Sequence, residues 1–193
     1  MALFMVAFER YRLLWIGSLA FFGAVLSLGF ACAEPLAAFA AIGAVTLRRR
    51  DALVVIAAVW LVNQFIGFAV LHYPLERGAL AWGGALCAAA LVATLAARWG
   101  SGRLSQSNRF TRAGAAFMAA FAAYEGILFA ISAMSATGIA DFAPAIVLRI
   151  FLINATAFAM LSLLRCAMAL GRGPLGGQNE NTLCAYPESF DAG

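Results

Sequence analysis

Hydrophobic residues gather into six stretches along the chain, separated by short polar breaks. Most stretches are near the roughly 20 residues that a helix needs to cross a bilayer core of about 30 Å. Charged residues, proline and glycine occupy the breaks, where helices end. The pattern predicts an all-α integral membrane protein, a bundle of six transmembrane helices with a short second helix. The six stretches are Leu13–Ala33, Leu36–Leu47, Ala52–His72, Gly78–Ala97, Ala113–Ala140 and Ala143–Leu164.

The first two stretches admit alternative interpretations. Leu36–Leu47 makes only about 18 Å of helix, so it crosses the membrane only if it includes preceding residues such as Cys32 to Glu34. Arg10 and Arg12 stand before an apolar run that ends in an A-x-A motif, as in a cleaved signal peptide. The run is longer than a usual signal core, and cleavage would remove the helical partner of the second stretch. A retained first helix is therefore the preferred interpretation.

The placement of arginine supports six crossings and predicts an orientation. The chain has 13 basic residues, and all of them are arginines. With the N-terminus in the cytoplasm, 11 of the 13 fall on the cytoplasmic side, which agrees with the positive-inside rule. Only Arg77 lies outside, and Arg149 lies within a span. The cytoplasmic arginines are Arg10, Arg12, Arg48, Arg49, Arg50, Arg98, Arg103, Arg109, Arg112, Arg165 and Arg172.

Composition narrows the class and the domain organisation. Hydrophobic residues make up 64% of the chain and charged residues 11%, which excludes a water-soluble fold. The arginines are scattered between apolar stretches, so nucleic acid is not an expected partner. We predict a transmembrane domain over residues 1–170, interrupted by a polar cytoplasmic loop at Gly100–Arg112, and a disordered cytoplasmic tail over residues 171–193. We expect a bacterial inner-membrane protein that contacts lipid, with both termini cytoplasmic.

Polar side chains inside the apolar stretches predict a site, because such groups are costly in hydrocarbon. Counted at about 1.5 Å per residue, four of them share the midplane: Asn63, Gln64, Glu125 and Asn154. Four more lie nearer the outer face: His72, Tyr73, Trp82 and Arg149. Glu34, Glu76, Arg77 and Asp141 lie at the rim. Together they predict a polar, aromatic-lined substrate site that opens outward; the alternative is that they hydrogen-bond one helix to another.

Two of these residues carry further expectations. A buried Arg149 requires a counter-charge, and Asp141 or Glu125 would supply it by depth. His72 precedes Tyr73-Pro74 at the outer end of its stretch, where it is either a ligand contact or an interfacial residue.

Signatures of enzymes and of metal sites are mostly missing from the sequence. No phosphate-binding loop, H-E-x-x-H motif or G-x-S-x-G elbow is present, so we expect a protein that is not an enzyme and has no intrinsic cofactor. The four cysteines show no zinc spacing. Cys87 is either a soft metal ligand or a small packing residue.

On the first helix, Ala20 and Ala24 stand four residues apart. With six helices in about 190 residues, a short second helix and cytoplasmic ends, the chain resembles the substrate-binding S components of energy-coupling factor vitamin transporters. The stretch from Trp60 through Asn63-Gln64 and His72-Tyr73-Pro74 to Trp82-Gly83 is similar to proteobacterial members associated with cobalamin.

The resemblance implies uptake of a vitamin, with cobalamin (a corrinoid) as the leading ligand and Cys87 as a ligand of its cobalt. It also implies a transmembrane coupling protein and ATPases as partners, docked on Ala20 and Ala24. A different function, a non-catalytic assembly or stabilising subunit of a larger membrane complex, stays open.

Overall fold

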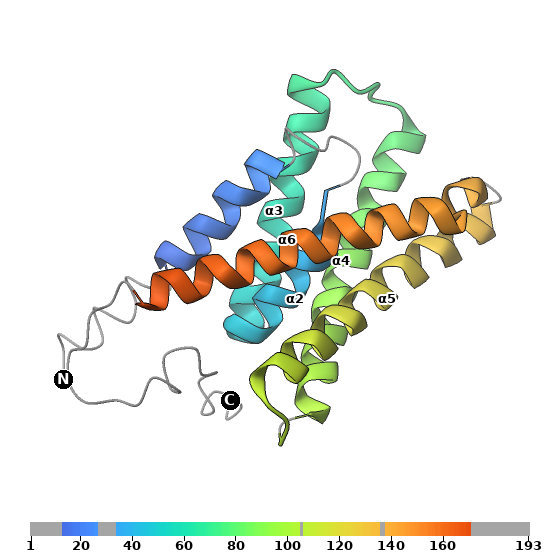
Figure 1. Ribbon diagram of the computed structural model, residues 1–193. Coiled ribbons are helices and arrows are strands. Elements are labelled where there is room, and N and C mark those ends of the chain that lie inside the picture. Colours follow the sequence, from blue (N-terminus) through green and yellow to red (C-terminus); the bar gives the residue numbers. More distant parts are fainter. Residues whose placement is uncertain (1–12, 27–33, 105, 136–137, 171–193) are drawn as a thin grey trace, which may run out of the picture.

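The computed structural model of the chain is helical (Figure 1). It describes residues 13–26, 34–104, 106–135 and 138–170, so the predicted tail and the A-x-A motif lie outside the described residues. Within these ranges there are six α-helices and no β-strand, which confirms the all-α prediction. The α-helices are an N-terminal helix Leu13–Leu26, α2 Leu36–Thr46, α3 Arg49–Phe65, α4 Arg77–Arg103, α5 Arg109–Ser135 and α6 Pro144–Leu170.

Four of these helices are long and apolar enough to cross a membrane. Including the π-helical turn that ends α3, they cover Arg49–Val70, Arg77–Arg103, Arg109–Ser135 and Pro144–Met168. The N-terminal helix and α2 are shorter within the described residues. Glu34 and Pro35 precede α2 in non-helical conformation, so Glu34 could contribute to a second crossing only from outside the helix, while Cys32 and Ala33 lie outside the described residues. Proline disfavours the helical conformation in the residue before it, which explains why α2 does not begin at Glu34.

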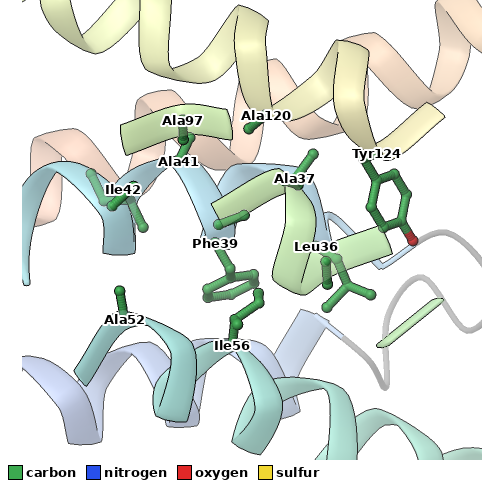
Figure 2. Close-up of a cluster of buried hydrophobic side chains, with 14 of the residues drawn as sticks. Leu36, Ala37, Phe39, Ala41, Ile42, Ala52, Ile56, Ala97, Ala120 and Tyr124 are labelled. Atoms are coloured by element: carbon green, nitrogen blue, oxygen red, sulfur yellow. The ribbon is translucent and has the colours of Figure 1, made fainter. Parts of the chain in front are cut away.

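The short helix α2 is the centre of the protein rather than one of its walls. Every residue from Leu36 to Ala44 is buried, and α2 contacts α3, α4, α5 and α6. Figure 2 shows Phe39 directed at Ile56 of α3, while Ala41 faces Ala97 of α4 on the opposite side. A helix that is apolar all round is one buried on all sides, and its many alanines let four neighbours approach closely.

Polar side chains from other helices hold both ends of α2. The Asn154 side chain of α6, 1% exposed, accepts a hydrogen bond from the backbone N–H of Ala38 at 3.1 Å. At the other end the Arg98 guanidinium of α4 donates to the carbonyl oxygens of Ala44 at 3.2 Å and Leu47 at 3.0 Å. The ends of a helix leave backbone groups without intrahelical partners, and a cation is favourable at the C-terminal end. These contacts satisfy such groups in the protein interior.

The connection between α4 and α5 is shorter than the predicted polar loop. Helix α4 continues through Gly100, Ser101 and Gly102 to Arg103, and α5 begins at Arg109. The prediction of a loop from Gly100 is therefore wrong. The Ser101 hydroxyl donates to the Arg98 carbonyl at 3.0 Å, and Gly100 lies against α5, so tertiary contact keeps residues of low helix propensity in the helix.

Gly100 marks the closest approach of α4 to α5 and supports a stability prediction. A Cβ at Gly100 would lie 2.9 Å from the Ala119 Cβ and 3.1 Å from the Ala115 carbonyl oxygen, whereas a Cβ at Gly102 would have nothing within 4 Å. We expect Gly100→Ala to lower the free energy of unfolding by about 1–2 kcal/mol through overpacking. Gly102→Ala should leave it unchanged or raise it by up to about 1 kcal/mol through helix propensity. Thermal unfolding in detergent measures both, and equal melting temperatures would contradict the prediction.

The arginines of the α2–α3 and α4–α5 connections lie at one end of the bundle. Arg48 lies between α2 and α3, Arg49 and Arg50 begin α3, and the contact of Arg98 with Leu47 brings the end of α4 beside them. Arg77 begins α4 at the opposite end, where α3 connects to α4 (Figure 1). The charge asymmetry predicted from the sequence is thus present across α2 to α5.

Candidate functional site

A cavity of about 240 Å³ lies where α2 begins, at the end of the bundle away from the Arg48–Arg50 run. We call it the α2 cavity. It is bounded by the start of α2, the last turns of α3, the α3–α4 connection, the first turns of α4, and α5. Its lining residues are Glu34, Leu36, Asn63, Gln64, Gly67, Phe68, Tyr73, Ala79, Trp82, Gly83, Leu86 and Tyr124.

Glu34 lies in the wall at the N-terminal end of α2. Glu34 is 8% exposed, and its backbone carbonyl accepts a hydrogen bond from the Leu36 N–H at 2.8 Å. The N-terminal end of a helix carries a partial positive charge. That charge favours an acidic side chain next to Pro35. The sequence pattern placed Glu34 at the rim, and the structure places it in the cavity wall.

Two amide side chains from the last turn of α3 form the polar part of the lining. The Gln64 Nε2 donates to the Asn63 Oδ1 at 3.2 Å. The Gln64 Oε1 faces the backbone of Gly83, where a Cβ would lie only 2.5 Å from it. The carbonyl oxygen of the same residue, Gly83, accepts a hydrogen bond from the Trp60 indole N–H at 2.8 Å. The absence of a side chain at Gly83 therefore leaves the room that the Gln64 amide occupies.

A π-helical turn and a residue with left-handed backbone conformation form the wall of the α2 cavity between α3 and α4. The π-helix Ile66–Val70 ends α3, and such wide turns are frequent at functional sites. His72 follows with a φ of 56°, a left-handed conformation for which histidine is enriched among non-glycine residues. At His72 the chain folds back toward the end of α3, and the Tyr73 N–H donates a hydrogen bond to the Gly67 carbonyl at 3.0 Å. A Cβ at Gly67 would lie 3.0 Å from the Tyr73 ring, so glycine permits this contact.

Aromatic rings complete the wall on the α4 and α5 sides. Trp82 is half-buried and lies near Gly138 of the α5–α6 connection, whose added Cβ would meet the indole at 3.6 Å. Tyr124 is buried and comes from α5 on the side where α2 begins (Figure 2). The sequence pattern pointed to Glu125 rather than Tyr124. Side chains of successive helical residues point about 100° apart. The position along the chain therefore predicted the correct depth in the membrane but not which side of α5 faces the cavity.

Four of the eight predicted substrate-binding residues thus line one cavity: Asn63, Gln64, Tyr73 and Trp82. Glu125 is half-buried beside Tyr124 and is not among the lining residues. Asn154 contacts Ala38 in the core instead, which matches the helix-to-helix interpretation of its role. His72 is exposed, and its backbone conformation is the feature that bears on the cavity.

Arg149, Cys87 and the predicted docking alanines lie elsewhere. Arg149 is exposed on α6, as is Asp141 before that helix, so the expectation of a buried arginine is wrong. A long side chain on the outer surface of a membrane helix reaches polar surroundings by extending along the helix. Cys87 is partly buried one turn from Gly83 and is not among the lining residues. Ala20 and Ala24 are partly buried beside Gly23, whose added Cβ would lie 3.0 Å from Val59.

The lining has the composition of a small-molecule-binding site. It combines one carboxylate, two amides and four aromatic rings with small residues, the mixture of apolar walls and few polar groups that small-molecule sites use. Among the described residues, no group of three or more histidine, cysteine, aspartate or glutamate side chains is placed to hold a metal ion.

In comparisons with known proteins, no protein-family model, no curated protein and no solved structure matches the chain.

Proposed function

We propose that this protein is the substrate-binding membrane subunit of an uptake system and that it holds a small molecule in the α2 cavity. The convergence of Glu34, Asn63 and Gln64 with Trp82 carries the proposal. Polar groups within membrane helices are retained for substrate pathways or for helix contacts. Asn154 fulfils the second role at Ala38, whereas the cavity residues surround open space.

The arginine distribution supports an orientation for this subunit. With the Arg48–Arg50 end in the cytoplasm, the α2 cavity faces the outer side of a bacterial inner membrane, where a substrate arrives. Six crossings, with both termini cytoplasmic, complete the proposed topology. Since the sequence contains no phosphate-binding loop, uphill transport would draw on a coupling protein and ATPases.

The size of the cavity favours a small substrate. Its volume of about 240 Å³ is below the roughly 300–1,000 Å³ of pockets for drug-sized ligands. A corrinoid is larger than such ligands, so cobalamin would fit only if the α3–α4 and α5–α6 connections moved apart. A single-ring compound of vitamin size fits without that movement.

The test is the content of the protein after gentle purification in detergent. We expect mass spectrometry to detect a small molecule in about equimolar amount that is released on denaturation. A visible corrinoid spectrum would identify cobalamin as that molecule, and its absence together with a smaller ligand would favour the single-ring class. A protein that carries no ligand and binds none of the vitamins and corrinoids offered would contradict the proposal.

A second candidate function, an assembly or stabilising subunit, is favoured by α6. This helix is the least buried of the four long helices, and much of its apolar surface is exposed. Co-purification with partner proteins, combined with unchanged function when the α2 cavity is blocked, would support this candidate.

A further inference from the structure

Two arginine side chains are exposed where α4 ends and α5 begins, at the same end of the bundle as Arg48–Arg50. Arg103 is the last residue of α4 and Arg109 the first of α5. The chain from Arg77 to Tyr124 contains no acidic residue. Arg103 and Arg109 therefore carry positive charge in a part of the chain that has no negative charge of its own.

Both guanidinium groups lie over aromatic rings that are themselves exposed. The Arg103 Cζ is 4.1 Å from the centroid of the Trp99 ring, and the Arg109 Cζ is 5.0 Å from that of Phe110. Trp99 is 62% exposed and Phe110 is 74% exposed. The flat guanidinium of arginine can contact an aromatic face while the N–H groups at its edges remain available for hydrogen bonds. Each ring thus positions a guanidinium without using its donors.

Arg98 provides a contrast on the same helix. Its guanidinium donates to the carbonyl oxygens of Ala44 and Leu47 and so holds α2. Within the described part of the chain, no such hydrogen bond or ion pair occupies Arg103 or Arg109. Their donors are therefore available to a ligand.

The position of the exposed rings favours a lipid headgroup as that ligand. Helices α4 and α5 are both long and apolar enough to cross a membrane, and tryptophan is enriched at the interface between membrane and water. With Trp99 in that layer, the guanidinium groups at the shared end of α4 and α5 lie at the level of the headgroup phosphates. Arginine binds a phosphate through two parallel N–H···O bonds. An anionic phospholipid, unlike a zwitterionic one, brings no ammonium group that opposes this contact.

We propose that the α4–α5 end of the protein binds anionic phospholipid headgroups. Arg103 and Arg109 contact the phosphate, and Trp99 and Phe110 lie beside it in the interfacial layer. This lipid site is at the opposite end of the bundle from the α2 cavity, so it does not depend on the small molecule proposed there.

The experiment compares two lipids with the same acyl chains on the full-length protein in detergent. They are dioleoyl-phosphatidylglycerol, which is anionic, and dioleoyl-phosphatidylcholine, which is zwitterionic. Native mass spectrometry measures the lipid that is retained, and the melting temperature is followed as lipid is added. One basic residue near an anionic surface changes lipid affinity roughly fivefold, so we expect phosphatidylglycerol to bind at least about fivefold more tightly. Added salt should weaken this preference, because exposed charges are screened, and inorganic phosphate alone should not shift the melting temperature.

A pair of double variants assigns the preference to this site. Arg103→Gln/Arg109→Gln should reduce the difference between the two lipids to less than about twofold, because the phosphate loses both cationic contacts. The matched control is Arg77→Gln/Arg149→Gln, which removes two exposed arginines from other parts of the surface and changes the net charge equally. It should keep the fivefold preference. Since all four side chains are exposed, both variants should fold, and their melting temperatures without lipid check this.

Several outcomes would overturn the lipid site while small-molecule binding in the α2 cavity stands. They are equal affinity of the wild-type protein for the two lipids, an equal preference in the two double variants, and a shift with inorganic phosphate as large as that with phosphatidylglycerol. Loss of a co-purified protein from Arg103→Gln/Arg109→Gln, with the lipid preference unchanged, would also overturn it and would identify this end as a protein-docking surface.

Discussion

Replacing Gly83 with leucine should weaken ligand binding by roughly 100-fold, a loss of about 2.7 kcal/mol. The first carbon of the new side chain would lie 2.5 Å from the Gln64 Oε1. The remaining carbons would enter the α2 cavity, whose volume is only about 240 Å³. The variant therefore displaces the amide and fills the space that the substrate needs. Isothermal titration, or fluorescence titration with the ligand that mass spectrometry identifies, measures the loss.

The neighbouring glycine provides a matched control for that experiment. Gly84 is exposed, and a Cβ there would have nothing within 4 Å. Gly84→Leu makes the same chemical change on the same helix but directs the side chain away from the protein, so affinity should stay within about twofold. Gly83→Ala should give an intermediate loss, because the flexible Gln64 amide can move away from a methyl group. Equal affinity of the Gly83→Leu and Gly84→Leu proteins would place the binding site elsewhere.

Replacing Arg98 with methionine should lower the free energy of unfolding by about 2–4 kcal/mol. Methionine keeps most of the apolar stem but removes both donors from the Ala44 and Leu47 carbonyl oxygens. Both bonds are donated by the same nitrogen, Nη1, so we count them as one charged contact of about 1.5–3 kcal/mol, to which the positive charge at the C-terminal end of α2 adds roughly 0.3–1 kcal/mol. Because α2 is the centre of the core, its loosening affects every helix it contacts. Thermal or denaturant unfolding in detergent measures the change.

Arg103 is the control for Arg98. It lies on the same helix, is exposed, and packs over the exposed Trp99 ring at 4.1 Å. Arg103→Met should cost less than about 1 kcal/mol, as exposed cation–π pairs contribute little. Similar melting temperatures of the Arg98→Met and Arg103→Met proteins would show that Arg98 does not hold α2 in place.

Much of the cavity was predictable because depth in a membrane follows from position along the chain. Asn63, Gln64, Tyr73 and Trp82 were selected by polarity and depth alone, and they share one lining. Tyr124 was missed although its neighbour Glu125 was selected. The glycine that follows Trp82 was one indication of the cavity in the sequence, since the Gln64 amide lies against Gly83. The glycine pattern could have indicated a close approach without naming the partner.

Asn154 and Arg149 show that depth along the chain does not predict which side of a helix faces the protein core. Both are polar residues of α6 within an apolar stretch, yet Asn154 points into the core at Ala38 and Arg149 is exposed. In a soluble protein the apolar face of a helix reveals which side is buried. In a membrane helix the lipid-facing and core-facing sides are both apolar, so the sequence leaves rotation about the helix axis undetermined.

The sequence by itself determined that the chain is helical, that several helices are long and apolar enough to span a membrane, and that arginine gathers toward one end. These properties depend on composition along the chain and on the cost of placing backbone and charge in hydrocarbon. Only the tertiary structure decided that the short α2 lies in the centre, held at its two ends by Asn154 and Arg98. It alone also brought Glu34 and Gln64 into the lining of one cavity, because the meeting of residues from separate segments depends on how the helices rotate and pack.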